Sequence, residues 1–232
     1  MSETADISTL DGTRSFSAYC ARPAGVPRAA IVVIQEIFGV NAGIRRKCDR
    51  LAAEGYLALA PDLFWRLEPA IELDPDVESE FKQALELLGR FDQDQGVADI
   101  EATIRHARTA LGCAKVGAVG YCLGGRLAFM VAARTDADAS VGYYAVGIDG
   151  LLREKHAIAR PLMLHIAGND GFVPPPVQQA MHEGLDDHPK VALHDYPGED
   201  HGFATETGLR RSEAAAELAD SRTAAFFAEH LG

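Results

Sequence analysis

The sequence predicts a one-domain α/β fold in which helices cover both faces of a mostly parallel, twisted sheet. Two observations lead to this prediction. Strand-like and helix-like segments alternate along the 232 residues, a pattern typical of parallel strands joined by helical crossovers. The clearest strand candidate, residues 29–35, is an apolar run of the kind that is buried on both faces. Because 47% of the residues are hydrophobic, the chain can fill one core, and we expect a single domain over residues 1–232.

After this strand, the first half of the chain predicts three helices and a second strand. A helix over 44–54 ends at Gly55, since glycine commonly follows the last turn of a helix. A short strand over 57–60 stops at Pro61, which cannot donate to the strand ladder. Two further helices are expected over 75–88 and 96–111.

The second half of the chain alternates strands and helices without an internal repeat or a linker. Residues 115–119 are predicted as a buried strand, and residues 123–134 as the helix that follows it. The remaining strands are expected over 140–146, 161–167 and 191–196, and the remaining helices over 174–184 and 212–229. The acidic connection 63–95, which we expect to be helical, is the one candidate for a cap.

Composition and charge restrict the partners and the compartment. The chain has 22 Lys and Arg against 34 Asp and Glu, a formal net charge of −12, which argues against nucleic acid or an anionic membrane as partner. It shows neither a basic and apolar leader nor an apolar run of about 18 residues, so we expect no signal peptide and no membrane span. The four cysteines form no C-x-x-C pair, and a reducing cytoplasm is the expected location.

The turn at 120–125, with the sequence G-Y-C-L-G-G, carries the chemistry. A glycine-flanked nucleophile between a strand and a helix is the nucleophile elbow of α/β-hydrolases, so the fold prediction narrows to that class. The central residue is Cys122, where most such enzymes have serine, and this indicates thiolate chemistry. The alternative is an inert, buried cysteine, which is what we expect of Cys20, Cys48 and Cys113.

Two loops supply the groups that a cysteine nucleophile needs. Asp170 follows the predicted strand 161–167 in a polar turn, and His201 lies in a glycine-bounded loop after the last strand. The chain order Cys122, Asp170, His201 is the order that α/β-hydrolases use. In such a triad the imidazole takes the proton of the nucleophile, and the carboxylate fixes the imidazole tautomer. Asp200 is the rival carboxylate, and the strand-end position favours Asp170.

Backbone N–H groups are expected to stabilise the oxyanion of the reaction. The N–H of Leu123 follows the nucleophile directly, and Ile37, in the loop after the first predicted strand, is the candidate for the second donor. Glu36 precedes this loop, where a carboxylate would come near the nucleophile. From the residues alone, an ion pair of Glu36 with Arg46 or Arg126 fits the sequence as well as a catalytic role does.

Five short stretches share their pattern with one enzyme family. They are Q-E-I-F-G-V-N at 35–41, A-P-D-L at 60–63, V-G-Y-C-L-G-G at 119–125, V-G-Y-Y at 141–144 and F-V-P at 172–174. With these stretches the chain resembles the dienelactone hydrolases (carboxymethylenebutenolidases) from about residue 29 to its end. The resemblance implies a triad of Cys122, His201 and Asp170, and a Glu36 that takes the thiol proton when substrate binds. It also implies the opening of a cyclic enol ester through an acyl-enzyme.

The resemblance also shows where this chain departs from the family. The best-known members hold the substrate carboxylate with two arginines and a tyrosine, and the corresponding positions here are Phe81, Thr205 and Leu85. Burial of a carboxylate without a cationic partner is unfavourable. We therefore expect a more apolar pocket, to which Phe38 and Phe203 also contribute, that accepts neutral or differently placed esters or lactones. The cations that could supply a clamp from another direction are Arg66, Lys82, Arg126, Arg210 and Arg211.

Together these observations predict a cysteine hydrolase of lactones or of activated enol or aryl esters, acting through an acyl-enzyme without metal or cofactor. The substrate is expected to be a small molecule, and the protein a monomer or small homo-oligomer. Two alternatives stay open. One is acyl transfer or thioester hydrolysis on a larger acyl substrate, with the segment 63–95 bordering a channel. The other is a ligand-binding homologue without catalysis, against which the complete triad argues.

Overall fold

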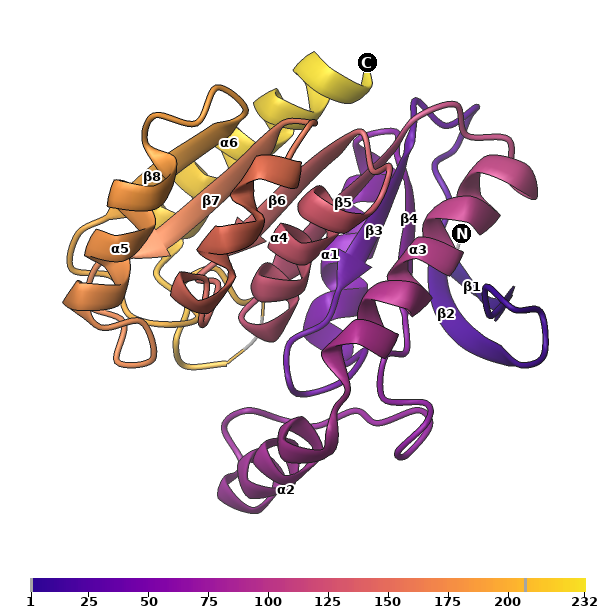
Figure 1. Cartoon of the computed structure of the whole chain (residues 1–232). Helices are drawn as coiled ribbons and strands as arrows, with labels where there is room; N and C mark the ends of the chain where they lie inside the picture. Colours follow the sequence, from indigo (N-terminus) through magenta and orange to yellow (C-terminus); the bar gives the residue numbers. More distant parts are fainter. Residues whose placement is uncertain (1, 207) are drawn as a thin grey trace. The chain divides into compact units, whose positions relative to one another are not determined.

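The computed structural model describes residues 2–206 and 208–232, so Met1 of the predicted domain range and Thr207 lie outside the described residues. The described residues form eight strands and six α-helices. The chain groups into two compact units: Met1–Gly117 with Glu206–Leu209 (unit 1), and Ala118–Thr205 with Arg210–Gly232 (unit 2). Figure 1 shows the chain from its indigo N-terminus to its yellow C-terminus.

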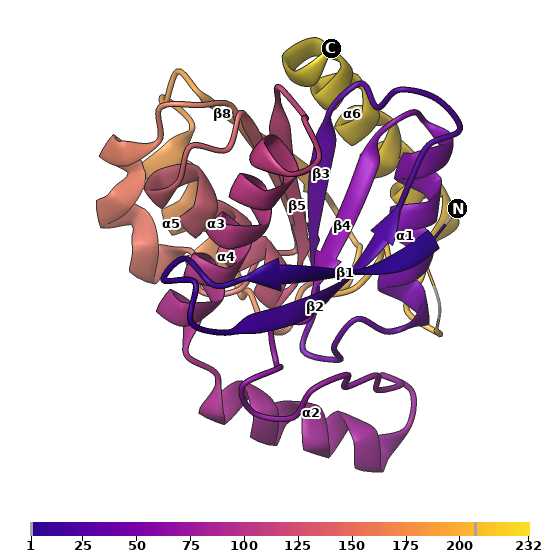
Figure 2. The same ribbon diagram turned by 90° about the vertical axis from the view of Figure 1, so that its right-hand side faces the viewer.

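Unit 1 contains four neighbouring strands. Their order is β1 (Ser2–Ser8), β2 (Ser15–Ala21), β4 (Leu57–Pro61) and β3 (Ala30–Ile34). β1 and β2 form an antiparallel hairpin, β2 is antiparallel to β4, and β4 is parallel to β3 (Figure 2). The sequence did not predict the hairpin, because β1 exposes most of its residues and lacks the continuous apolar run of β3 and β4.

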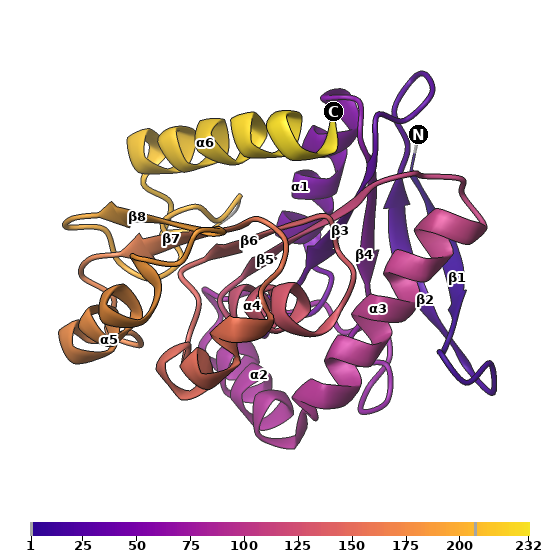
Figure 3. The same ribbon diagram turned by 45° about the horizontal axis from the view of Figure 1, so that its top comes forward.

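Helices cover both faces of the strands in unit 1. α1 (Ala42–Ala53) packs on one face and α3 (Gln93–Thr109) on the other (Figures 2 and 3). α1 begins where the Asn41 side chain accepts the N–H groups of Gly43 and Ile44, at 3.1 and 3.2 Å. The helical prediction for the acidic connection 63–95 is correct only for its second half, because α2 spans Glu78–Arg90 whereas residues 63–77 form turns and loop. α2 lies away from the strands of its unit (Figure 1).

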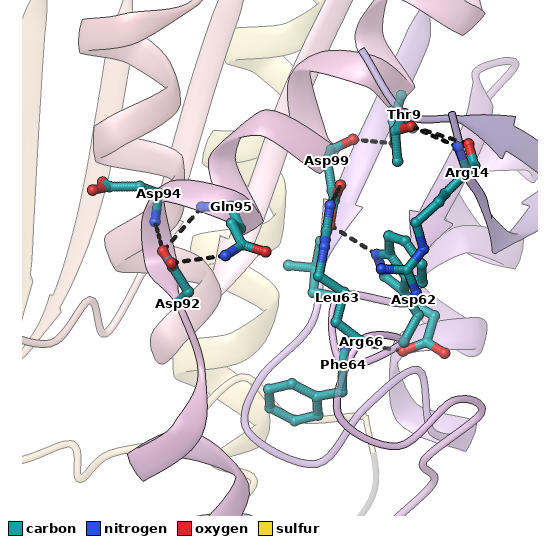
Figure 4. A network of polar contacts seen from close by, with 12 residues as sticks. Thr9, Arg14, Asp62, Leu63, Phe64, Arg66, Asp92, Asp94, Gln95 and Asp99 are labelled. Atoms are coloured by element: carbon teal, nitrogen blue, oxygen red, sulfur yellow. Dashed lines mark hydrogen bonds and ion pairs between the residues drawn. The ribbon is translucent and has the colours of Figure 1, made fainter. Parts of the chain in front are cut away.

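A buried carboxylate on α3 anchors the loop after β4 (Figure 4). Asp99 is 2% exposed and accepts hydrogen bonds from Trp65 Nε1 at 2.9 Å and from both terminal nitrogens of Arg66, one of them at 3.0 Å. The guanidinium groups of Arg14, from the hairpin, and of Arg66 each lie 4.2 Å from the Trp65 ring centre. In this network Arg66 forms an ion pair with Asp99, and the contacts connect the hairpin, the loop after β4 and α3.

Unit 2 contains most of β5 (Val116–Tyr121) and three further strands in the order β6 (Ala139–Tyr143), β7 (Leu162–Ala167) and β8 (Val191–Tyr196). β6 is parallel to β7, and β7 to β8. α4 (Leu123–Arg134), the 3-10 helix η1 (Asp149–Ala157) and α5 (Pro175–Leu185) lie on one face, and α6 (Glu213–Leu231) lies on the other (Figure 3). β5, β6 and β7 are buried along their whole length, as apolar strands between two helical layers should be.

The predicted elements of unit 2 are present with shifted ends. The strand expected over 115–119 continues to Tyr121, and the strand expected over 140–146 stops at Tyr143, because Tyr144 has a φ of 36° and leaves the extended conformation. The sequence did not predict η1. Of the helices in the described residues, none combines the length and the apolar character needed to cross a membrane.

Candidate active site

Cys122 occupies a sharp turn between β5 and α4. Its φ of 56° and ψ of −113° lie outside the regions that residues with a side chain ordinarily adopt. The Cys122 N–H donates to the Tyr143 carbonyl at 3.0 Å, and the Cys122 carbonyl accepts the N–H of Arg126 at 3.1 Å. These two bonds fix the strained residue between the end of β6 and the first turn of α4.

The glycines of the elbow are required by close contacts. A Cβ atom on Gly120 would lie 1.9 Å from the carbonyl oxygen of Gly124, and one on Gly125 would lie 2.7 Å from the carbonyl oxygen of Tyr143. Both distances are far below van der Waals contact, and the opposing atoms belong to the backbone. The glycines at positions 120 and 125 are therefore required by the tight packing of the turn against α4 and β6.

A buried carboxylate holds the imidazole of His201. Asp170 Oδ2 lies 2.7 Å from His201 Nδ1, and the two side chains are 0% and 6% exposed. The other oxygen of Asp170 accepts the N–H of Phe172 at 2.8 Å, which fixes the carboxylate itself. The rival, Asp200, accepts the backbone N–H of His201 at 2.6 Å. Of the two carboxylates, Asp170 is the one bonded to the ring.

The environment of His201 favours its charged form. Burial alone lowers the pKa of His201, but hydrogen bonds to Asp170 and to the Cys122 thiol, together with the negative charges of these groups, raise it to about 10. The imidazole therefore joins Cys122 to Asp170 and is cationic at neutral pH. A cation beside the sulfur stabilises a thiolate.

Two aromatic rings enclose the imidazole. The ring centres of Tyr144 and Phe172 lie 5.0 and 4.8 Å from that of His201, both in edge-to-face geometry. Phe172 is 55% exposed, so one side of its ring faces solvent. Neither residue was predicted as part of the site, although both occur in the matched stretches 141–144 and 172–174. Phe203, which was predicted to line the pocket, is 1% exposed and packs 5.6 Å from Tyr144, so its effect on a substrate would pass through that ring.

The remaining predicted residues of unit 2 lie at the start of α4 and after the His201 loop. Leu123 is the first residue of α4, so its N–H lies in the turn that has no intrahelical acceptor. The Thr205 carbonyl accepts a hydrogen bond from Arg211 at 3.0 Å. The Thr205 hydroxyl is buried, and it has no hydrogen-bond partner among the described residues.

The predicted site residues of unit 1 fall on the loop after β3 and on α2. Ile37 and Phe38 are buried, and Glu36 is half-buried. The rings of Phe38 and Phe81 lie 5.9 Å apart, so the structure brings these two together. Leu85 follows one turn later on α2 and is 45% exposed. The roles of Glu36 and Ile37 toward the nucleophile stay predictions.

Four of the five cations that could replace the carboxylate clamp have partners inside their own unit. Arg66 binds Asp99, Lys82 binds Glu78, Arg126 binds the Gly147 carbonyl and Arg211 binds Glu213. The fifth, Arg210, packs its stem beside Gly202. A substrate carboxylate would have to compete with the partners of the first four.

The other three cysteines are buried. Cys20 and Cys48 are 0% exposed and Cys113 is 7% exposed, whereas Cys122 is only partly buried. Burial raises the pKa of each of the three thiols. Among the four, Cys122 is thus the accessible sulfur.

Known proteins resemble this chain over most of its length. Residues 16–231 match the sequence profile of the dienelactone hydrolase family. The chain belongs to the dienelactone hydrolase family. It is 48% identical over 221 residues to a provisionally named carboxymethylenebutenolidase of Azospirillum brasilense, which covers 94% of this chain and 95% of that protein. It is 42% identical over 229 residues to a carboxymethylenebutenolidase of Pseudomonas putida, which covers 98% and 97%.

Solved structures of dienelactone hydrolase relatives show the same architecture. The crystal structure of a provisionally named dienelactone hydrolase of Klebsiella pneumoniae superimposes with a TM-score of 0.85, at 29% identity and with 99% of each chain covered. The predicted α/β-hydrolase fold is thereby confirmed. This member of the dienelactone hydrolase family is a carboxylic ester hydrolase.

Proposed function

We propose that this dienelactone hydrolase relative attacks its ester or lactone through the thiolate of Cys122. The observation that carries the proposal is the hydrogen-bonded line from Cys122 through His201 to Asp170, set on a strained turn. Asp170 engages Nδ1, which leaves Nε2 of His201 to hold the proton that the Cys122 thiol gives up. The resemblance to the family adds Glu36 as a second acceptor for that proton when substrate binds.

In the proposed reaction, the sulfur attacks the carbonyl carbon and the carbonyl oxygen becomes an oxyanion. The N–H groups of Leu123 and Ile37 stabilise that oxyanion. Collapse of the intermediate expels the enolate or aryloxide, which takes the proton from His201, and leaves a thioester on Cys122. His201 then activates a water that hydrolyses the thioester. Enol and aryl esters suit this route, because a poor leaving group would be expelled less readily than the thiol itself.

The pocket is proposed to favour neutral or differently placed esters and lactones. Phe81 stands at a position where the best-known relatives have a cation, and its ring packs on Phe38. Leu85 continues the apolar surface one turn later. A buried substrate carboxylate would meet no cation from these positions, which is unfavourable.

The decisive experiment is steady-state hydrolysis of an aryl acetate by the wild type, Cys122→Ala and Cys122→Ser, with Cys113→Ala as matched control. We expect Cys122→Ala to abolish turnover and Cys113→Ala to retain it. Iodoacetamide should label Cys122 before the three buried cysteines, and substrate should slow the labelling. Turnover by Cys122→Ala, or labelling of Cys48 or Cys113 first with activity retained, would refute the assignment.

The same assay separates the alternatives. A new ester or thioester product on addition of alcohol or thiol acceptors would indicate acyl transfer. Saturable binding of substrate without turnover would indicate a ligand-binding homologue. We further propose a cytoplasmic location, which the four free cysteines support, and a protein without nucleic-acid partners, which the net charge of −12 supports.

A further inference from the structure

A chain of polar side chains, buried except at the half-buried Asp220, crosses the interior of unit 2, and the proposed reaction does not use it. His165 on β7 lies 2.8 Å from the Tyr196 hydroxyl through Nδ1 and 3.0 Å from Thr223 Oγ1 through Nε2. Thr223 Oγ1 lies 2.6 Å from the Tyr143 hydroxyl, which donates to Asp220 at 3.0 Å. These five residues are the Thr223 network. They join β6, β7 and β8 to α6, and Thr223 lies at the centre.

The hydrogen bonds of the Thr223 network run in one direction. The single hydroxyl proton of Tyr143 goes to Asp220, so Thr223 must donate its own proton to Tyr143. The Thr223 oxygen then accepts from Nε2–H of His165. Nδ1 of His165 is consequently unprotonated, and it accepts the hydroxyl proton of Tyr196. Thr223 therefore accepts a hydrogen bond from His165 of β7 and donates one to Tyr143 of β6.

This direction requires a neutral His165. Burial, together with the nearby His194 and the positive Arg222, lowers the pKa of His165 well below 6.5. Arg222 also donates to the Tyr196 hydroxyl at 3.1 Å, which leaves the hydroxyl proton of Tyr196 for His165. Protonation of His165 at Nδ1 would place this N–H donor against the hydroxyl proton of Tyr196 in the protein interior. The network is therefore a single, fully specified arrangement.

The main chains of two network residues hold the active site. The Tyr143 carbonyl accepts the N–H of Cys122 at 3.0 Å, and the His165 carbonyl accepts the N–H of Tyr144 at 2.8 Å. The Tyr144 ring in turn packs against His201. The side chains of Tyr143 and His165 are thus both hydrogen-bonded to Thr223. Their backbone carbonyls accept the N–H groups of Cys122 and of Tyr144, whose ring packs against His201.

We propose that Thr223 of α6 is a positioning residue for the Cys122 nucleophile. Apolar packing could hold α6 on the sheet, but it would tolerate small sliding movements, whereas hydrogen bonds weaken steeply when their distance or angle changes. The hydroxyl of Thr223 fixes Tyr143, at the end of β6, relative to His165 of β7, and with them the two carbonyls that hold Cys122 and Tyr144. The inference rests on the proposed role of Cys122 as nucleophile.

The test compares Thr223→Val, which keeps the shape and removes the hydroxyl, with Thr223→Ser, which keeps the hydroxyl. For Thr223→Val we expect kcat and the rate of Cys122 alkylation by iodoacetamide to fall by roughly 10- to 100-fold, the size that a slight misplacement of a reacting group produces. KM for an aryl acetate should change by less than about twofold, because Thr223 does not touch substrate. Thr223→Ser should restore most of both rates.

The matched control is Thr103→Val in unit 1. Thr103 is fully buried on α3 and donates to the Asp99 carbonyl at 2.8 Å. This variant should lower the melting temperature and leave kcat and the alkylation rate unchanged. If Thr223→Val does not fold, Tyr143→Phe takes its place as the test variant, because it removes the hydroxyl to which Thr223 donates.

Two outcomes would overturn the inference. One is a folded Thr223→Val, or in its place Tyr143→Phe, with wild-type kcat and alkylation rate. The other is an equal loss of both rates in Thr103→Val, which would reduce the effect to general stability. If either result is obtained while Cys122→Ala is inactive, it refutes the positioning role of Thr223 and leaves the proposed nucleophile unaffected. Turnover by Cys122→Ala would refute the assignment of Cys122 as the nucleophile.

Discussion

A left-handed backbone at Cys122 costs about 1–3 kcal/mol relative to an ordinary conformation. The surrounding structure supports this strain with two backbone hydrogen bonds and with glycines at positions where a Cβ atom would collide with the backbone. A cysteine that served only to fill space would need neither. The strain instead presents the sulfur at the end of β5, next to the start of α4 and within reach of His201.

The charge of His201 makes the stability of the fold depend on pH. Its pKa of about 10 in the folded protein lies above the ordinary value of 6.5, so the charged imidazole stabilises the fold fully below pH 6.5. This contribution declines as the pH rises and is lost above about pH 10. Urea unfolding of the wild type and of His201→Gln should therefore show a stability difference that narrows with pH, by at most about 1.4 kcal/mol per unit.

Gln179→Ala serves as the control for this measurement, because Gln179 is an exposed residue of α5 whose side chain does not titrate. Its stability difference from the wild type should stay constant across the same pH range. A difference for His201→Gln that is constant or that widens with rising pH would show that the imidazole is not held in its charged form.

At the scale of elements, α2 determines the expected selectivity. Phe81 packs on Phe38 and Leu85 is exposed, so the helix offers apolar surface at positions where the resemblance to the family implies contacts with a substrate carboxylate. Phe81→Arg combined with Thr205→Arg should raise kcat/KM for a carboxylate-bearing lactone relative to a neutral aryl ester by roughly tenfold or more. A hydrogen bond to a charged group contributes about 1.5–3 kcal/mol, which corresponds to that factor.

The control for the α2 variant is Phe81→Leu, which keeps the apolar surface and should leave the preference for neutral esters in place. A wild type that already prefers the carboxylate-bearing lactone would contradict the proposed selectivity. It would also indicate that one of the cations, such as Arg211, exchanges its present partner for the substrate.

Other elements illustrate what local patterns can predict. The buried strands β3, β5 and β7 were expected, because their apolar runs are visible without knowledge of their neighbours. The β1–β2 hairpin was not, because its strands are half-exposed and gain their order from pairing with each other and with β4. The 3-10 helix η1 lacks a strong apolar period, and it packs against α4 and α5.

At the scale of the whole molecule, the predicted single domain leads to a test of cooperativity. The contacts divide the chain into two units, and Trp65, the only tryptophan of the sequence, reports on unit 1. If the chain is one domain, urea unfolding followed by Trp65 fluorescence and by far-ultraviolet circular dichroism should give the same midpoint. Two separated midpoints would show that the units unfold independently.

The sequence by itself determined the class of the fold and the family, and it predicted the chemistry proposed for Cys122, Asp170 and His201. These depend on local features: apolar runs, glycines that a tight turn requires, and the order of residues along the chain. Only the tertiary structure decided that Asp170 rather than Asp200 meets the imidazole, and that Arg66, Lys82, Arg126 and Arg211 are engaged by other groups.

The Thr223 network shows the physical reason for this division. Thr223 is 58 residues from His165 and 80 from Tyr143 in the chain, and no local pattern marks a threonine on a closing helix as a hydrogen-bond partner of either. A buried polar group is unfavourable without a hydrogen-bond partner, but only the packing of α6 on the sheet decides which partner each of these groups has.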